Sequence, residues 1–267
     1  MTELDRLFAA TLVEDEEASW QAVVALQRAG SEEVLQRALD WVRSPIARER
    51  ARAVDVLGQL GTPRPTAELR QQCANALLEL ATREKDAPIL NSIGIALGHL
   101  GDARAVEAMA PFATHPSADV RYGVVLALSV HEAGVDTLIQ LSGDPDENVR
   151  NWATFALGSQ LEQVDRPSLR DALVARLEET DRELRGEALL GLALRKDPRV
   201  IEPLRRELAS GVITVLAIEA AQRLGDPQFA PLLRAELDAA PATAPQHWRD
   251  ALAQAVTELE AGQKQRP

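Results

Sequence analysis

The chain has 267 residues, of which 46% are hydrophobic and only 3% aromatic, and its formal net charge is −12. Alanine and leucine supply most of the apolar residues, which favours packed helices over a sheet, because sheets are enriched in β-branched and aromatic residues. The acidic charge argues against binding to nucleic acid, and the single cysteine, Cys73, excludes an internal disulfide.

Residues 1–17 form the predicted N-terminal cap, with a helix near residues 3–13 followed by the acidic run 14–17. Carboxylates favour the N-terminus of a helix, so this run is interpreted as the start of the next helix. The first residues lack the basic start and apolar run of a secretion signal, and no apolar run approaches the ~18 residues that cross a membrane. We therefore expect a cytoplasmic protein without membrane contacts.

From residue 18 to residue 240, short turns recur every 29 to 40 residues, many of them with glycine, as at Gly30, Gly101 and Gly225. Each repeat divides into two stretches whose apolar residues recur at helical spacing. In the third repeat, Ile93 and Leu97 lie on the stripe of the first helix, before a second helix that starts near residue 105. Periods of this length are typical of solenoids.

Residues 245–262 follow a proline-containing linker and are predicted to form a helix that caps the open end of the stack. Residues 263–267 are expected to be a frayed tail. The chain is thus predicted to be one all-α domain, residues 1–267, with about seven helix pairs in a right-handed α-solenoid.

An arginine follows an apolar residue at the start of several first helices, as in Val120-Arg121, Val149-Arg150 and Leu184-Arg185. Together with Ala-Leu-Gly and Leu-Gly-Asp at the helix ends, this pattern resembles HEAT-like repeats, in particular the short bacterial kind also found in phycobilin lyases. The resemblance implies a binding scaffold in which each arginine reaches an acidic residue of a neighbouring repeat. Asp146 and Asp181 are the expected partners.

Two enzyme classes that are known on this scaffold find little support in the sequence. Deoxyhypusine hydroxylase holds iron with several His-Glu pairs, whereas this chain has one, His131-Glu132, and a diiron site needs ligands from facing helices. We expect His131 to be half-buried and bonded to a carbonyl. A DNA glycosylase needs a basic groove, and the chain is acidic. Its four tryptophans are scattered, and Trp152 is predicted to lie in the core.

A phycobilin-lyase-like or lyase-chaperone activity on a tetrapyrrole is the alternative that stays open. Cys73 lies on an apolar helical stripe and is expected to be a buried thiol. No nucleophile–base pair, phosphate loop or metal spacing occurs, so no catalytic, cofactor-binding or metal-binding residue is predicted and no cofactor is expected. The departures from the repeat consensus, namely His131-Glu132, the Pro63–Pro65 loop and Arg195-Lys196, are the places to search for a ligand.

The preferred hypothesis is a non-catalytic scaffold that binds another protein or a peptide on its concave surface. The resemblance implies that second helices line that surface. Their exposed polar positions are the candidate partner-binding residues: Gln71, Gln72, Asn75, Arg104, Arg170, Arg205, Arg206 and Arg234.

Overall fold

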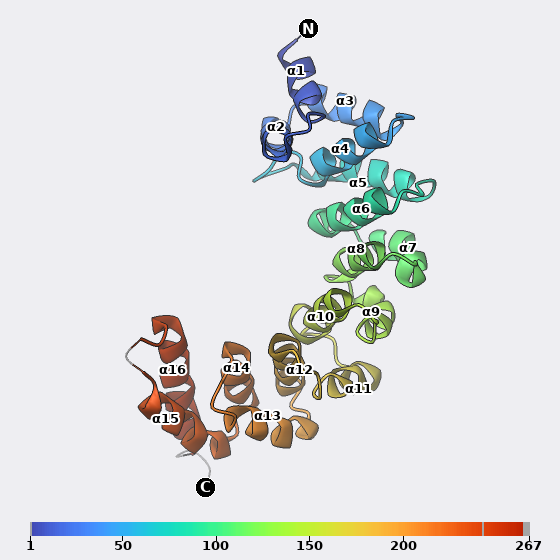
Figure 1. The fold of residues 1–267 in the computed structure, drawn as a ribbon. Coiled ribbons are helices and arrows are strands. Elements are labelled where there is room, and N and C mark those ends of the chain that lie inside the picture. Colours follow the sequence, from blue (N-terminus) through green and yellow to red (C-terminus); the bar gives the residue numbers. More distant parts are fainter. Residues whose placement is uncertain (1, 242, 264–267) are drawn as a thin grey trace. The chain divides into compact units, whose positions relative to one another are not determined.

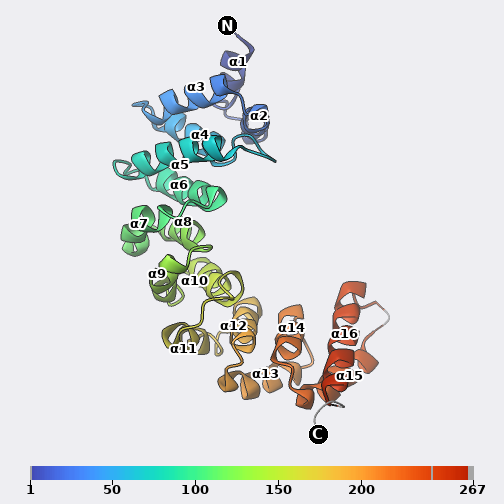
Figure 2. The same ribbon diagram turned by 180° about the vertical axis from the view of Figure 1, so that it is seen from behind.

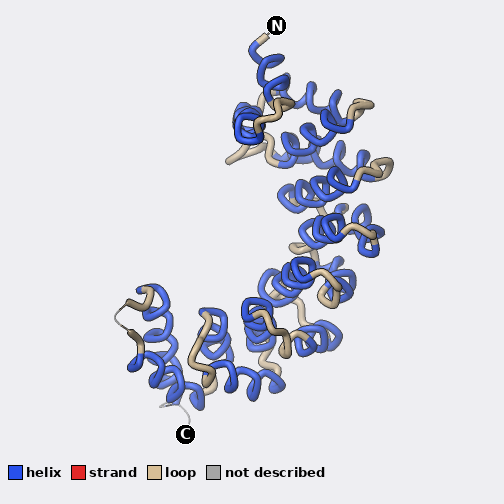
Figure 3. The backbone as a smooth tube through the Cα atoms, in the orientation of Figure 1, coloured by secondary structure: helices blue, strands red, loops and turns tan. Residues whose placement is uncertain are grey.

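The computed structural model describes residues 2–241 and 243–263, and in these residues all regular structure is helical. Sixteen α-helices and no strand occur there, which confirms the all-α prediction (Figures 1 and 3). No helix in the described part of the chain is long and apolar enough to cross a membrane.

The chain divides into two compact units, Met1–Thr137 and Leu138–Pro267, with the boundary inside helix α9 (Val135–Leu141). The first unit contains α1 (Glu3–Ala10), α2 (Glu16–Ala29), α3 (Glu32–Val42), α4 (Ala47–Gly58), α5 (Ala67–Ala81), α6 (Ala87–Leu100), α7 (Ala105–Met109) and α8 (Ala118–Leu128). The second contains α10 (Glu147–Phe155), α11 (Pro167–Ala175), α12 (Arg182–Leu194), α13 (Ile201–Leu208), α14 (Val215–Leu224), α15 (Ala230–Ala239) and α16 (Gln246–Gln263).

Seven helix pairs run from α2/α3 to α14/α15, as the repeat spacing predicts. Within each unit the first helices of successive pairs pack against one another, with α4, α6 and α8 in the first unit and α10, α12 and α14 in the second. Within each unit, Figures 1 and 2 show the first helices in one row and the second helices in a row beside it. Helix α16 packs against α14 and α15, where a capping helix was expected, and residues 264–267 of the expected tail lie outside the described residues.

The glycine turns have the backbone conformation that their sequence predicts. Gly30, Gly101 and Gly225 end their helices with φ of 54°, 65° and 70°. This left-handed conformation favours glycine, because it has no Cβ to clash with the backbone. Inside the stack, Leu97 and Leu157 are fully buried, so the predicted apolar stripes form the core.

The first helices also approach each other backbone to backbone at glycines. A Cβ on Gly94 of α6 would lie 2.3 Å from the carbonyl oxygen of Gly123 in α8. In the second unit, a Cβ on Gly191 of α12 would lie 2.6 Å from the Cα of Gly158. No side chain fits at these crossings, and the close approach holds neighbouring repeats in a fixed register.

In some repeats an arginine near the start of the first helix bonds within its own repeat. Arg150 donates to the carbonyl oxygens of Asp144 and Pro145 and lies 3.5 Å from the carboxylate of Glu179, which follows α11. Arg185 repeats the arrangement and pairs with Glu207 of α13 at 2.9 Å.

The predicted carboxylate contact of these arginines is thus confirmed, but the expected partners, Asp146 and Asp181, are wrong. Their carboxylates accept hydrogen bonds from the backbone N–H groups of Val149 and Leu184 and cap the N-termini of α10 and α12. The arginines instead reach an acidic residue in or after the second helix of the same repeat.

Candidate functional site

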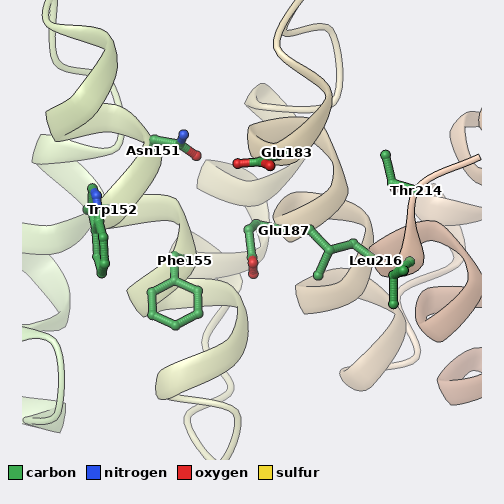
Figure 4. A pocket seen from close by; sticks show the side chains of 8 residues that line it. Asn151, Trp152, Phe155, Glu183, Glu187, Thr214 and Leu216 are labelled. Atoms are coloured by element: carbon green, nitrogen blue, oxygen red, sulfur yellow. The ribbon is translucent and has the colours of Figure 1, made fainter. Parts of the chain in front are cut away.

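A pocket of about 460 Å³ opens on the row of first helices in the second unit. This is within the size range of ligand-binding clefts. Its walls come from α10, α12 and the start of α14 (Figure 4), and the lining residues are Asn151, Trp152, Phe155, Glu183, Glu187, Thr214, Val215 and Leu216. We call this pocket the α10–α12–α14 groove.

Aromatic and aliphatic side chains form two walls of the groove. The Trp152 ring is 5.7 Å from that of Phe155, at an interplanar angle of 83°, and Trp152 is 42% exposed. Val215 on the opposite wall is also 42% exposed. The prediction that Trp152 lies in the core is wrong, because Val149 and Ala153 define the buried stripe of α10 and Trp152 falls at its edge, facing the groove.

Two carboxylates of α12 lie between these walls. Glu183 is exposed, and in Figure 4 its side chain and that of Asn151 point toward each other across the groove. Glu187 is half-buried and accepts a 2.6 Å hydrogen bond from the hydroxyl of Ser159. Burial raises the pKa of Glu187 above its ordinary value; the Ser159 hydrogen bond lowers this pKa, and the carboxylates of Glu219 and Glu183 raise it. The ionised form of Glu187 is therefore less stable in the folded chain than in water.

A π-helical turn, Ala156–Gln160, directly follows Phe155, which lines the groove. The backbone N–H of Leu161 donates to the carbonyl oxygen of Ala156, five residues earlier, at 2.9 Å. π-Helical turns are rare in proteins, and those that occur are often found at functional sites. Here the turn carries Ser159, the residue that holds the Glu187 carboxylate. The sequence of the turn is that of an ordinary helix, so sequence reasoning missed it.

Arg195 holds this turn in place. The side chain is 6% exposed and donates hydrogen bonds of 2.8–3.2 Å to five backbone carbonyls. These belong to Leu157, Gly158, Leu161, Val164 and Gly191. The guanidinium thus satisfies the acceptors that the end of a helix leaves open.

The neighbouring Lys196 has a left-handed φ of 53° and caps the end of α14 by donating to the carbonyls of Arg223 and Leu224. Arg195 and Lys196, which depart from the repeat consensus, therefore connect neighbouring repeats. Neither residue lines the groove.

The eight residues predicted to bind a partner lie elsewhere. Gln71, Gln72, Asn75 and Arg104 belong to the first unit, and Arg170, Arg205, Arg206 and Arg234 lie on the second helices of the second unit. The five arginines are engaged in ion pairs, for example Arg206 with Glu178 at 2.9 Å and Arg234 with Glu260 at 2.8 Å. No residue of the predicted set lines the groove, and their role in binding stays a prediction.

Arg170 belongs to a network around Asp197, whose carboxylate lies 2.7 Å from Arg199 and 3.4 Å from Arg170. The hydrogen bond from Arg199 lowers the pKa of Asp197 to about 2. Because the unfolded carboxyl titrates near 4, Asp197 contributes stability above that pH and loses it as the pH falls through about 2.

In urea unfolding between pH 5 and pH 2, Asp197→Asn should therefore be less stable than wild type at pH 5. The difference should shrink as the pH falls toward 2. Asp171→Asn, which removes an exposed partner of Arg199, is the control and should change the profile little. A constant difference across this range would show that Asp197 does not titrate as described.

The other reactive or metal-binding side chains considered from the sequence do not form a site in the described residues. No cluster of three or more histidine, cysteine or acidic residues suited to a metal occurs in the described ranges. Burial raises the pKa of the Cys73 thiol to about 12, and the side chain is 1% exposed, which confirms a buried thiol. His131 is half-buried as expected, but its Nε2 atom has no hydrogen-bond partner, so the predicted carbonyl contact is not made there.

Comparison with known proteins supports the repeat class. Residues 135–225 match the family model for HEAT repeats. A 119-residue segment is 40% identical to protein YibA of Escherichia coli K12, a match that covers 44% of this chain and 42% of the length of YibA. The crystal structure of E. coli YibA aligns with 97% of this chain and 93% of its own, with a TM-score of 0.79 and 26% identity.

Residues 135–225 are therefore HEAT repeats, and the fold of the chain is a HEAT/armadillo-like solenoid. The particular protein that it resembles in both comparisons is YibA. The complex of CpcE and CpcF of phycocyanin lyase from Nostoc sp. PCC7120 aligns over 97% of this chain and 95% of its own, with a TM-score of 0.49 and 18% identity. A structural similarity at this level does not indicate lyase activity.

Proposed function

We propose that the protein is a non-catalytic docking module that binds a segment of another protein in the α10–α12–α14 groove. The observation that carries this proposal is the exposed Trp152, edge-on to Phe155 in a pocket of about 460 Å³. HEAT repeats generally mediate protein interactions, which fits the family match over this unit.

The apolar walls supply the free energy for such binding. Trp152 and Val215 keep large apolar surfaces in water on opposite sides of the groove. Exposed apolar patches with polar rims are typical of interaction sites, and buried tryptophan is among the commonest binding hot spots. A segment laid between α10 and α14 would cover both side chains.

The groove is also built on rigid elements. Gly158 and Gly191 fix the crossing of the π turn with α12, and Arg195 fastens the turn itself. A preformed site loses little entropy on binding, so affinity does not require reorganisation of the groove.

The test is a selection of 12-residue peptides from a random phage-displayed library on the immobilised full chain. Peptides that it enriches should bind the Trp152→Ala variant about tenfold or more weakly than wild type, because the main apolar contact is lost. Fluorescence anisotropy with labelled peptide measures both affinities.

Trp20→Ala is the matched control, since Trp20 is 46% exposed and lies in the first unit. It should leave affinity unchanged, and both variants should melt like wild type. Enriched peptides that bind Trp152→Ala as tightly as wild type would remove the groove from consideration.

A further inference from the structure

We infer that the segment held in the groove presents a cationic side chain, preferentially an arginine, to Glu183 and Glu187 beside the rings of Trp152 and Phe155. The inference rests on the proposed function and names the chemistry of the partner: a basic, partly apolar segment of a protein.

The two carboxylates lack a counter-charge of their own. Glu183 and Glu187 are four residues apart on α12 and share one face, where like charges repel. Among the described residues no ion pair reaches either one. The neighbouring cations are engaged elsewhere, with Arg185 on Glu207 and Arg223 on Glu219. Arg182 donates to the carbonyl of Val212.

Glu187 gains most from a cation. It is half-buried and accepts a hydrogen bond from the neutral hydroxyl of Ser159. Its raised pKa reflects lost hydration together with repulsion by Glu219 and Glu183. A guanidinium in the groove would supply the missing charge and offset the desolvation of this carboxylate.

The aromatic wall favours the same ligand. Trp152 and Phe155 line the same pocket as the two carboxylates, and in Figure 4 the Phe155 ring lies near the Glu187 side chain. A cation within about 6 Å of such a ring is attracted by its quadrupole. Arginine is planar and weakly hydrated, so it can stack on a ring while it donates to a carboxylate.

The opposite wall and the net charge complete the description of the partner. Val215 and Leu216 offer only apolar contact, so the segment must carry apolar side chains next to its cation. The chain's formal charge of −12 attracts basic segments and repels acidic ones before contact.

The phage selection described above also tests this inference. Enriched peptides should be rich in arginine or lysine at one position and poor in acidic residues, relative to the unselected library. One such peptide is then synthesised twice, with arginine and with citrulline, its neutral near-isostere. Wild type should bind the arginine peptide about tenfold or more tightly.

The double variant Glu183→Gln/Glu187→Gln should lose this preference and bind both peptides alike. Glu202→Gln on α13, which is exposed and outside the groove, should retain it. Because the raised pKa of Glu187 means that its charge opposes folding at pH 7, Glu187→Gln should keep or raise the melting temperature. Lost binding then cannot be attributed to lost structure.

The outcomes separate the two claims. Enriched peptides that need Trp152 but show no basic preference would overturn the cationic partner and leave the docking groove standing. A basic preference that persists in the double glutamine variant would place the cation elsewhere and also overturn the inference. Peptides indifferent to Trp152 would overturn the proposed function itself.

Discussion

Replacing Arg195 by methionine should lower the free energy of unfolding by about 3 kcal/mol or more. Arg195 is 6% exposed, and its guanidinium donates to five backbone carbonyls: two in the π turn, two in the stretch that follows the turn, and one in α12. A buried acceptor that loses its donor costs about 1–3 kcal/mol, and methionine fills the volume without supplying any donor.

One effect works in the opposite direction, since burial lowers the pKa of Arg195 and its removal relieves that desolvation. An ion pair replaced as a whole by apolar residues can be neutral for this reason. Here only one partner is removed and the carbonyls stay buried, so the loss dominates.

Arg206→Met is the control for this prediction, because Arg206 is 63% exposed and pairs with Glu178 at the surface. It should change stability by less than about 1 kcal/mol. Urea unfolding of both variants measures the difference. Equal, small changes would mean that the π turn does not depend on Arg195.

Gly94→Ala should destabilise the first unit by about 2 kcal/mol or more. The new Cβ would lie 2.3 Å from the carbonyl oxygen of Gly123 and 2.4 Å from its carbon, so α6 must move away from α8. Both contact atoms are backbone and cannot rotate aside. This displacement opens a packed helix crossing, where overpacking costs about 1–3 kcal/mol, and it outweighs the ~1 kcal/mol that alanine gains in a helix interior.

Gly262→Ala in α16 is the matched control, since a Cβ there meets nothing within 4 Å. This change should be neutral or stabilising by up to about 1 kcal/mol. Chemical unfolding of the two variants makes the comparison. A Gly94→Ala chain as stable as wild type would mean that α6 and α8 are not held at the described distance.

The fold could be predicted because its signals are local. Helical spacing of apolar residues and glycine at positive φ act within a few residues, so the seven helix pairs and the turns at Gly30, Gly101 and Gly225 follow from the sequence. The close glycine crossing of Gly94 with Gly123 depends on the distance between helices and leaves no local signal.

The candidate site was harder to predict for three physical reasons. Trp152 sits one step off the buried stripe, and periodicity alone does not separate the edge of a stripe from its centre. The π turn at residues 156–160 is fixed by Arg195, about 35 residues further along the chain. The groove also gathers Glu187 and Val215 from different repeats, a juxtaposition that only packing establishes.

The most direct test of the account compares two surfaces of the second unit with one selected peptide. The affinity of that peptide is measured for Trp152→Ala in the groove and for Arg205→Glu/Arg206→Glu on α13, the surface that the sequence suggested. We expect a loss of about tenfold or more for Trp152→Ala and an unchanged affinity for the double variant. Full affinity in Trp152→Ala together with loss in the arginine variant would contradict it and place the partner on the second helices.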